Sequence, residues 1–171
     1  MKAPEHERSD INPIGYFSLL KKNSAFRNLW YGQVISELGN WINSIALYAL
    51  ILKLTGSGMA MAAAMMAKLL PMVVISPFAG VVIDRMNKKT ILIVSDILRC
   101  FTVLGFLIVE SRADLWLVYT LTLFEVALTG FFEPARSAII PSIVSKNHLV
   151  TANTLSGATW SIMLALGAAL G

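Results

Sequence analysis

Cysteine and histidine are scarce in this chain of 171 residues, and their scarcity excludes several kinds of site. Cys100 is the single cysteine, so no internal disulfide can form, and it lies in an apolar run without His or Cys neighbours at metal-ligand spacing. The two histidines, His6 and His148, lie in polar stretches far apart in the sequence. The sequence also contains no recognisable nucleophile–base pair and no glycine-rich phosphate loop. We therefore expect no metal site, no cofactor and no enzyme.

Charged residues are also few. They make up 14% of the chain, where soluble domains carry about 25%, and 56% of the residues are hydrophobic. The charges cluster between long apolar runs, which is typical of a protein that crosses a membrane several times. The net charge of +4 does not indicate nucleic-acid binding, because the basic residues lie in short connectors and not on one amphipathic face.

Five apolar runs predict an all-α membrane protein with five transmembrane helices: about 29–52, 59–83, 90–109, 115–132 and 152–171. A helix rises 1.5 Å per residue, so about 20 residues cross a hydrocarbon core of roughly 30 Å. Residues 1–28 form a polar segment before the first run, without the apolar stretch of a cleavable signal peptide. In the longest connector, 133–150, Pro134 and Pro141 argue against a continuous helix.

The basic residues predict the orientation of the chain. Ten of them precede the first run or lie between runs two and three or four and five, against two on the opposite side, Lys53 and Arg112. The ten are Lys2, Arg8, Lys21, Lys22, Arg27, Arg85, Lys88, Lys89, Arg136 and Lys146. Cytoplasmic loops carry the excess of Lys and Arg, so the N-terminus and residues 1–28 are expected in the cytoplasm.

The fifth run, 152–171, is apolar up to its last residue and has no polar flank. A natural chain normally continues past the bilayer, so we expect this sequence to be the amino-terminal part of a longer protein, cut within its fifth helix. The alternative is a true C-terminus at the outer face.

Five ionisable residues lie within the runs, where each costs a few kcal/mol if it faces lipid. They are Glu37, Lys68, Asp96, Arg99 and Glu125. Asp96 and Arg99 are three residues apart, so they share a helix face and can form an intramembrane ion pair. A structural role for this pair is favoured over contact with a substrate.

Two of the predicted helices carry a polar stripe. In the first run, polar residues spaced by four, three and four share one helix face: Gln33, Glu37, Asn40 and Ser44. In the fourth run, the corresponding polar residues are Thr122, Glu125 and Thr129. Counted from the expected cytoplasmic ends, Glu37 and Glu125 lie at a similar depth of roughly 12–14 Å. The stripes either line an aqueous pathway or form polar helix–helix contacts, and spacing alone leaves both possibilities open.

The segment GVVIDRMNKK, residues 80–89, resembles the motif that joins the second and third helices of the major facilitator superfamily. The motif is written G-x-x-x-D-R-x-G-R-[KR], and five of its positions match: Gly80, Asp84, Arg85, Lys88 and Lys89. Asn87 replaces the second glycine. Since Asn tolerates left-handed backbone better than most residues, we expect the turn to be preserved.

Further segments resemble the drug- and siderophore-exporting branch of that superfamily, which includes macrolide-efflux and enterobactin-exporter-type proteins. They are FRNLWYGQVISELGNWINSIALYALILKLTGS (26–57), SDILR (95–99) and FFEPARSAIIPSIVSKNHLVTAN (131–153). The resemblance implies two six-helix halves that rock around a substrate at the middle of the bilayer. The five predicted helices then belong to the six-helix N-terminal half, and the remaining C-terminal half is a partner outside this sequence.

The resemblance also implies roles for residues. The first and fourth helices of this superfamily line the central cavity, so Glu37 and Glu125, with Gln33 and Asn40, are candidates for the substrate and proton pathway. The acidic residue of the loop motif contacts a helix N-terminus in the other half, a role that falls to Asp84, while Arg85 and Lys88 lie at the lipid headgroups.

These expectations define the function we infer from the sequence. It is a multi-pass protein of the cell membrane, inner or plasma, that exports drugs, siderophores or similar amphipathic small molecules in exchange for protons. The alternative is a truncated bundle that transports nothing: a gene fragment, or a structural or regulatory protein.

Overall fold

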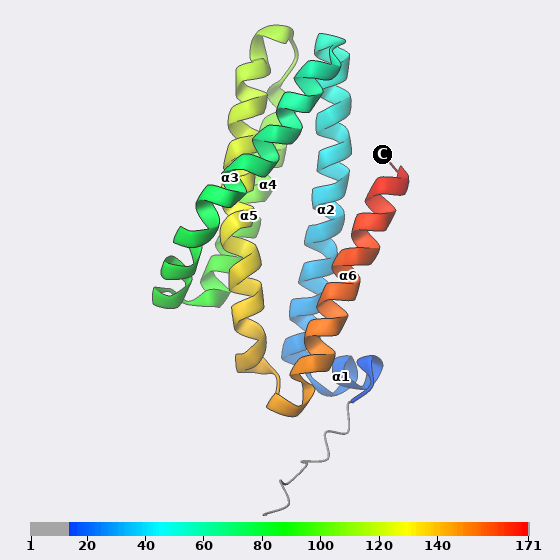
Figure 1. The fold of residues 1–171 in the computed structure, drawn as a ribbon, viewed down its shortest axis with the longest axis vertical. Helices are drawn as coiled ribbons and strands as arrows, with labels where there is room; N and C mark the ends of the chain where they lie inside the picture. Colours follow the sequence, from blue (N-terminus) through cyan, green and yellow to red (C-terminus); the bar gives the residue numbers. More distant parts are fainter. Residues whose placement is uncertain (1–13, 171) are drawn as a thin grey trace, which may run out of the picture.

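The computed structural model describes residues 14–170 as a bundle of long helices joined by short connections (Figure 1). The helices are α1 (Tyr16–Lys22), α2 (Ser24–Thr55), α3 (Gly58–Arg85), α4 (Lys88–Gly105), α5 (Leu115–Ile143) and α6 (Leu149–Leu170). Single 3-10 turns lie at Phe106–Ile108, Arg112–Asp114 and Lys146–His148. The part of the expected N-terminal segment before residue 14 and the last residue of the fifth run lie outside the described residues.

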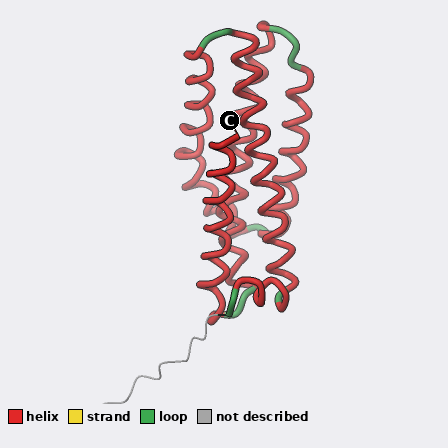
Figure 2. The backbone as a smooth tube through the Cα atoms, turned by 90° about the vertical axis from the view of Figure 1, so that its right-hand side faces the viewer, coloured by secondary structure: helices red, strands yellow, loops and turns green. Residues whose placement is uncertain are grey.

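The long helices alternate in direction, so α2 to α6 form an antiparallel bundle (Figures 1 and 2). One end carries the α2–α3 and α4–α5 connections, and the other carries α1 with the α3–α4 and α5–α6 connections. The α2–α3 turn depends on Gly56, whose φ of 63° is left-handed backbone that glycine adopts without a steric penalty. Ser57 then accepts a hydrogen bond from the Ala60 amide and caps α3.

The helices have the length and composition of membrane spans. Four described stretches are long and apolar enough to cross a bilayer, and a shorter apolar stretch, Gly58–Leu69, begins the 28-residue helix α3. The four are Ser24–Thr55, Lys88–Ile108, Arg112–Ile143 and Lys146–Gly167. Large apolar side chains such as Phe78, Phe101 and Trp160 are exposed, and lipid is the fitting solvent for them. The chain is therefore an all-α membrane protein, as the sequence predicted.

The prediction that α5 ends before Pro134 and Pro141 is wrong. This helix continues through both prolines to Ile143 and contains 29 residues. A proline removes one backbone hydrogen bond, but packing opposes that loss, since Ala135 and Ile140 on the same stretch are almost completely buried. Helices in membranes tolerate proline where neighbouring helices pack against them.

The buried apolar side chains gather in three clusters. One joins α3, α4 and α5 around Ala79, Ile83 and Phe132, and another joins α1, α2, α5 and α6 around Leu19 and Phe26. The third joins α2, α3, α5 and the α4–α5 connection at the opposite end: Leu47, Ile51, Ala64, Val109 and Val118. The polar side chains described below lie mainly on α2, α4 and α5, with Lys68 on α3.

Two further contacts set the position of α2. A Cβ atom at Gly167 of α6 would collide with the Trp41 ring, so only glycine lets these two helices approach this closely. At the other end, the Asn23 side chain donates a hydrogen bond to the Ile143 carbonyl at 2.7 Å and accepts one from the Phe26 amide at 2.9 Å. Asn23 therefore caps α2 and ties it to the end of α5.

Candidate functional site

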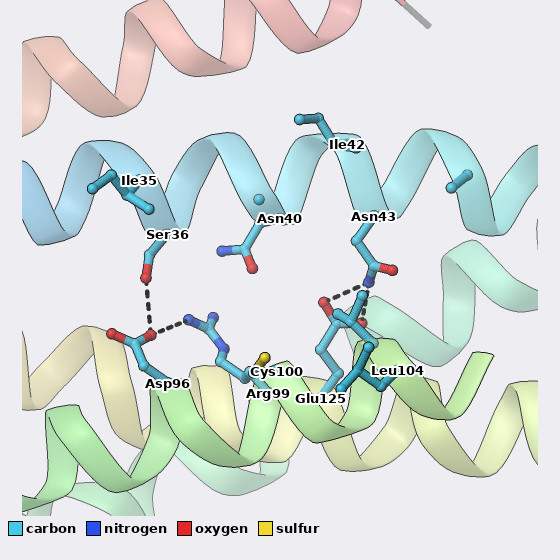
Figure 3. A pocket seen from close by; sticks show the side chains of 13 residues that line it. Ile35, Ser36, Asn40, Ile42, Asn43, Asp96, Arg99, Cys100, Leu104 and Glu125 are labelled. Atoms are coloured by element: carbon cyan, nitrogen blue, oxygen red, sulfur yellow. Dashed lines mark hydrogen bonds and ion pairs between the residues drawn. The ribbon is translucent and has the colours of Figure 1, made fainter. Parts of the chain in front are cut away.

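A cavity of about 580 Å³ lies between α2 and α4, and α5 contributes one acidic side chain to its wall (Figure 3). Apolar residues make up much of the lining, including Ile35, Ile42, Val103 and Leu104. The polar lining residues are Ser36, Asn40, Asn43, Asp96, Arg99 and Glu125. A cavity with an apolar wall and a few convergent polar groups is typical of a small-molecule site.

Glu125 is the acidic residue from α5, and the residue is 5% exposed. The side-chain amide of Asn43 on α2 lies 2.9 Å from each of its two oxygens and donates to both (Figure 3). The pair therefore joins the two helices through a buried charge-assisted contact. Asn43 was not in the predicted set, although it lies three residues after Asn40 and so on a neighbouring part of the same face.

Asp96 and Arg99 lie on α4, across the cavity from α2. Their Oδ1 and Nη1 atoms are 3.5 Å apart, and the Ser36 hydroxyl donates to the same aspartate oxygen at 2.9 Å. Arg99 also donates to the Thr129 hydroxyl at 2.7 Å and lies 4.9 Å from the Phe132 ring centre. The arginine is buried, whereas the Asp96 side chain is 44% exposed. The pair thus connects α4 to both α2 and α5.

A smaller cavity of about 170 Å³ also adjoins Glu125. Its lining residues are Asn40, Lys68, Glu125, Val126 and Thr129. The Lys68 ammonium, from α3, donates to the Ser44 hydroxyl at 2.7 Å and lies 5.8 Å from the Tyr48 ring centre. Asn40 and Glu125 line both cavities, so the two spaces share a wall.

Glu37 and Gln33 belong to a different cluster, where α2 meets α5 and α6. The Gln33 amide nitrogen donates to Glu37 at 2.7 Å and to the Ser156 carbonyl at 3.0 Å. Arg136 donates to the Gln33 amide oxygen at 3.0 Å and to Glu133 at 2.7 Å. The Glu37 Oε2 atom is buried and has no hydrogen-bond partner among the described residues.

Two expectations from the sequence are wrong, one about Arg136 and one about the depth of the two carboxylates. Arg136 was counted among the charges of a cytoplasmic connector, but it lies inside α5 and is 8% exposed. The expected equal depth of Glu37 and Glu125 also fails, because it assumed that α5 ends near residue 132. Glu125 binds Asn43, which is six residues and therefore about 9 Å further along α2 than Glu37. Gln33 and Glu37 are not among the described residues that line either cavity.

The loop motif lies at the α3–α4 connection. Gly80, Asp84 and Arg85 belong to the last turns of α3, and Lys88 and Lys89 begin α4. Asn87 has a φ of −69°, so the expected left-handed turn is absent; its side chain instead accepts from the Lys89 amide at 3.0 Å and caps α4. Asp84, Arg85 and Lys89 are exposed at this end of the bundle. Within residues 14–170, no three His, Cys, Asp or Glu side chains lie close enough together to hold a metal ion.

These features define the class of the protein first. It is an all-helical protein that spans a membrane several times and holds charged side chains around two cavities between its helices. The profile of the transmembrane secretion effector family matches residues 15–171. The chain belongs to this family of the major facilitator superfamily. Transmembrane transport, including efflux, is the function at the level of the family.

Named relatives agree with this assignment. An uncharacterized MFS-type transporter of Bacillus subtilis, YfiS, is 29% identical over 154 residues, which are 90% of this chain and 36% of the relative. Macrolide efflux protein A of Streptococcus pyogenes is 29% identical over 72% of this chain and 31% of its own length. The putative bacilysin exporter BacE of Bacillus subtilis is 32% identical over 89% of this chain and 37% of its own length.

The chain therefore spans about a third of the length of these curated relatives. No solved structure matches the chain.

Proposed function

We propose that this chain forms part of a secondary active exporter that moves amphipathic small molecules, such as drugs or siderophores, out of the cell in exchange for protons. The family and the names of two relatives, a macrolide efflux protein and a bacilysin exporter, support export. The observation that carries the proposal is Glu125, a buried carboxylate at the wall shared by two cavities. A buried charge in this position is costly in free energy, and a helix with only a structural role does not require one.

The two carboxylates have separate roles in this proposal. Glu125, with Asn40, faces the cavities and contacts the substrate. Glu37 exchanges protons: it is buried, it forms no ion pair among the described residues, and its Oε2 atom has no hydrogen-bond partner there. Gln33 positions Glu37 and links it to Arg136.

Transport by alternating access requires a second half. The matched relatives are nearly three times as long as the segment they share with this chain, which supports a C-terminal half as its partner. The described bundle then acts as the N-terminal half, and the substrate is bound near the middle of the bilayer.

We further propose that the protein lies in the cell membrane, the inner one in bacteria with two membranes, with its N-terminus in the cytoplasm. Without Arg136, nine of the counted basic residues still lie on the expected cytoplasmic side, against Lys53 and Arg112. In a Cys100→Ser background, a membrane-impermeant maleimide is expected to label Lys53→Cys in intact cells and Arg85→Cys only after permeabilisation. The reverse pattern would overturn the orientation.

Asp84 serves as a latch in this proposal, since its exposed carboxylate can bind the positive N-terminal end of a helix in the second half. Asp84→Asn is expected to lower the turnover of the complete transporter by roughly two- to fivefold, which corresponds to a loss of about 0.5–1 kcal/mol of helix-dipole interaction. Initial efflux rates measure the effect, and Asp84→Glu, which keeps the charge, is the control. Equal rates for Asp84→Asn and the wild type would remove the latch.

The whole proposal is tested by efflux from pump-deficient bacteria that express the complete transporter. Accumulation of a panel of macrolides, siderophores and peptide antibiotics is measured with and without a protonophore. Export that persists after the proton gradient collapses would refute proton coupling. The absence of export of every compound would favour the truncated, non-transporting bundle.

A further inference from the structure

Two opposite charges face the smaller cavity without being paired with each other. Lys68 on α3 and Glu125 on α5 both line this space of about 170 Å³. The structure records two ion pairs among the described residues, Arg99 with Asp96 and Arg136 with Glu133, and neither involves Lys68 or Glu125. A buried or half-buried charge is costly without a partner, so this arrangement calls for a ligand or for water between them.

Helix α2 holds each of the two charges in place from outside the cavity. Asn43 donates to both oxygens of Glu125, and Ser44 accepts from the Lys68 ammonium. The Tyr48 ring lies near the same ammonium. Each carboxylate oxygen has a second lone pair, and the ammonium has two further protons, so both groups keep hydrogen-bonding capacity for a ligand.

The neighbouring charges do not cancel this pair. Arg99 donates to Thr129, which lines the smaller cavity, but the arginine is itself paired with Asp96. One unpaired positive group and one unpaired negative group therefore remain at the cavity. A ligand with only an ammonium leaves Lys68 uncompensated, and one with only a carboxylate leaves Glu125 uncompensated.

We infer that the smaller cavity binds the head of an amphipathic zwitterion of the α-amino-acid type, its ammonium against Glu125 and its carboxylate against Lys68. The inference rests on the proposed function, whose substrate class it names. The side-chain amide of Asn40 lines the same wall and can hydrogen-bond to the head. The Thr129 hydroxyl already donates to the Glu125 backbone carbonyl and accepts from Arg99, so it keeps one lone pair for the ammonium. Charge-assisted hydrogen bonds at both ends of one small group give the site its selectivity.

The apolar part of the ligand lies in the larger cavity. This cavity shares Asn40 and Glu125 with the smaller one, and its remaining wall includes Ile42, Val103 and Leu104. A zwitterionic head in the small space that Lys68 and Glu125 line, and an apolar body in the larger one, match the two volumes of about 170 and 580 Å³. Polar groups fix the orientation, and apolar contacts contribute most of the buried area.

The experiment measures binding of four matched probes to the purified 171-residue chain in lipid nanodiscs. The probes are L-phenylalanine, which is zwitterionic; N-acetyl-L-phenylalanine, which is anionic; L-phenylalaninamide, which is cationic; and N-acetyl-L-phenylalaninamide, which is neutral. Radiolabelled L-phenylalanine is bound, and the other three compete with it. The zwitterion is expected to bind about tenfold more tightly than either singly capped probe, since each capping removes one charge-assisted contact.

Two variants assign the two ends of the ligand. Lys68→Met keeps the length of the side chain and is expected to remove the preference for a free carboxylate, so that L-phenylalaninamide competes as well as L-phenylalanine. Glu125→Gln keeps the size and is expected to remove the preference for a free amino group. Lys53→Met and Glu110→Gln are the controls, because both residues are exposed and lie outside the cavities. Circular dichroism of each variant establishes that the bundle is folded.

The inference is overturned by no binding of L-phenylalanine, by equal binding of the four probes, or by a preference that neither variant changes. Tightest binding of the cationic probe would also overturn it, in favour of a site for cations alone. The proposed function can fail by itself. In that case the complete transporter exports nothing, although the chain keeps its preference for the zwitterion. If the transporter exports neutral compounds and the chain shows no charge preference, the inference fails and export stands.

Discussion

Glu125→Gln in the complete transporter is expected to reduce proton-driven efflux to the level of cells that lack the transporter. Glutamine has the size of glutamate and still offers one side-chain oxygen to the Asn43 amide, which now lies 2.9 Å from both carboxylate oxygens. The contact between α2 and α5 is therefore retained in part, whereas the negative charge at both cavities is lost. The large effect should fall on transport and not on folding.

The measurement is the initial rate of efflux from preloaded cells at matched membrane levels of the variant and the wild type. Glu110→Gln, which neutralises an exposed carboxylate outside the cavities, is the matched control and should export normally. Glu37→Gln is expected to uncouple efflux from the proton gradient, because Glu37 is the proposed site of proton exchange and a glutamine amide cannot take up or release a proton in its place. Unchanged efflux in both Glu125→Gln and Glu37→Gln would remove the two carboxylates from the mechanism.

Arg136→Met is expected to destabilise the 171-residue bundle by about 2 kcal/mol, mainly because the buried Gln33 oxygen loses its donor at 3.0 Å. Leaving such a group without a partner costs about 1–3 kcal/mol. The lost pair with Glu133 adds less, since that side chain is 28% exposed and water screens the interaction. The free energy of unfolding is measured by denaturant titration of the detergent-solubilised chain.

The control for this experiment is Arg85→Met, which removes an exposed arginine at the end of α3. A double-mutant cycle with Gln33→Leu isolates the contact. If the two single effects add within about 0.5 kcal/mol, the two side chains are not energetically coupled and the assignment of Arg136 as a link between α2 and α5 is wrong.

The length of α5 shows where reasoning from the sequence failed. Proline carries a strong local signal to end a helix, so Pro134 and Pro141 predict an end near residue 132. The outcome depended on residues from other helices, because this part of α5 packs in two of the apolar clusters, through Ala135 and Ile140. The mistaken end of α5 also places Arg136 in a connector, and it gives Glu37 and Glu125 the same depth in the bilayer.

The contacts between side chains of different helices could not be predicted from the sequence either. Periodicity placed Glu37, Asn40 and Ser44 on one face of the first helix, but it could not identify Asn43 as the partner of Glu125. The sequence places Lys68 inside an apolar run without indicating which carboxylate shares its cavity. These pairings depend on the rotation and axial offset of one helix against another, which the local pattern does not contain.

The sequence by itself determined the class of the protein and its long helices, because the cost of moving charged or unpaired polar groups into lipid depends on composition along each segment. It also placed Asp96 and Arg99 within reach of each other, since the spacing of three residues acts inside one helix. Only the tertiary structure decided where α5 ends, which carboxylates face the cavities and what each one contacts. These features follow from packing between helices, and such packing involves residues that are far apart in the chain.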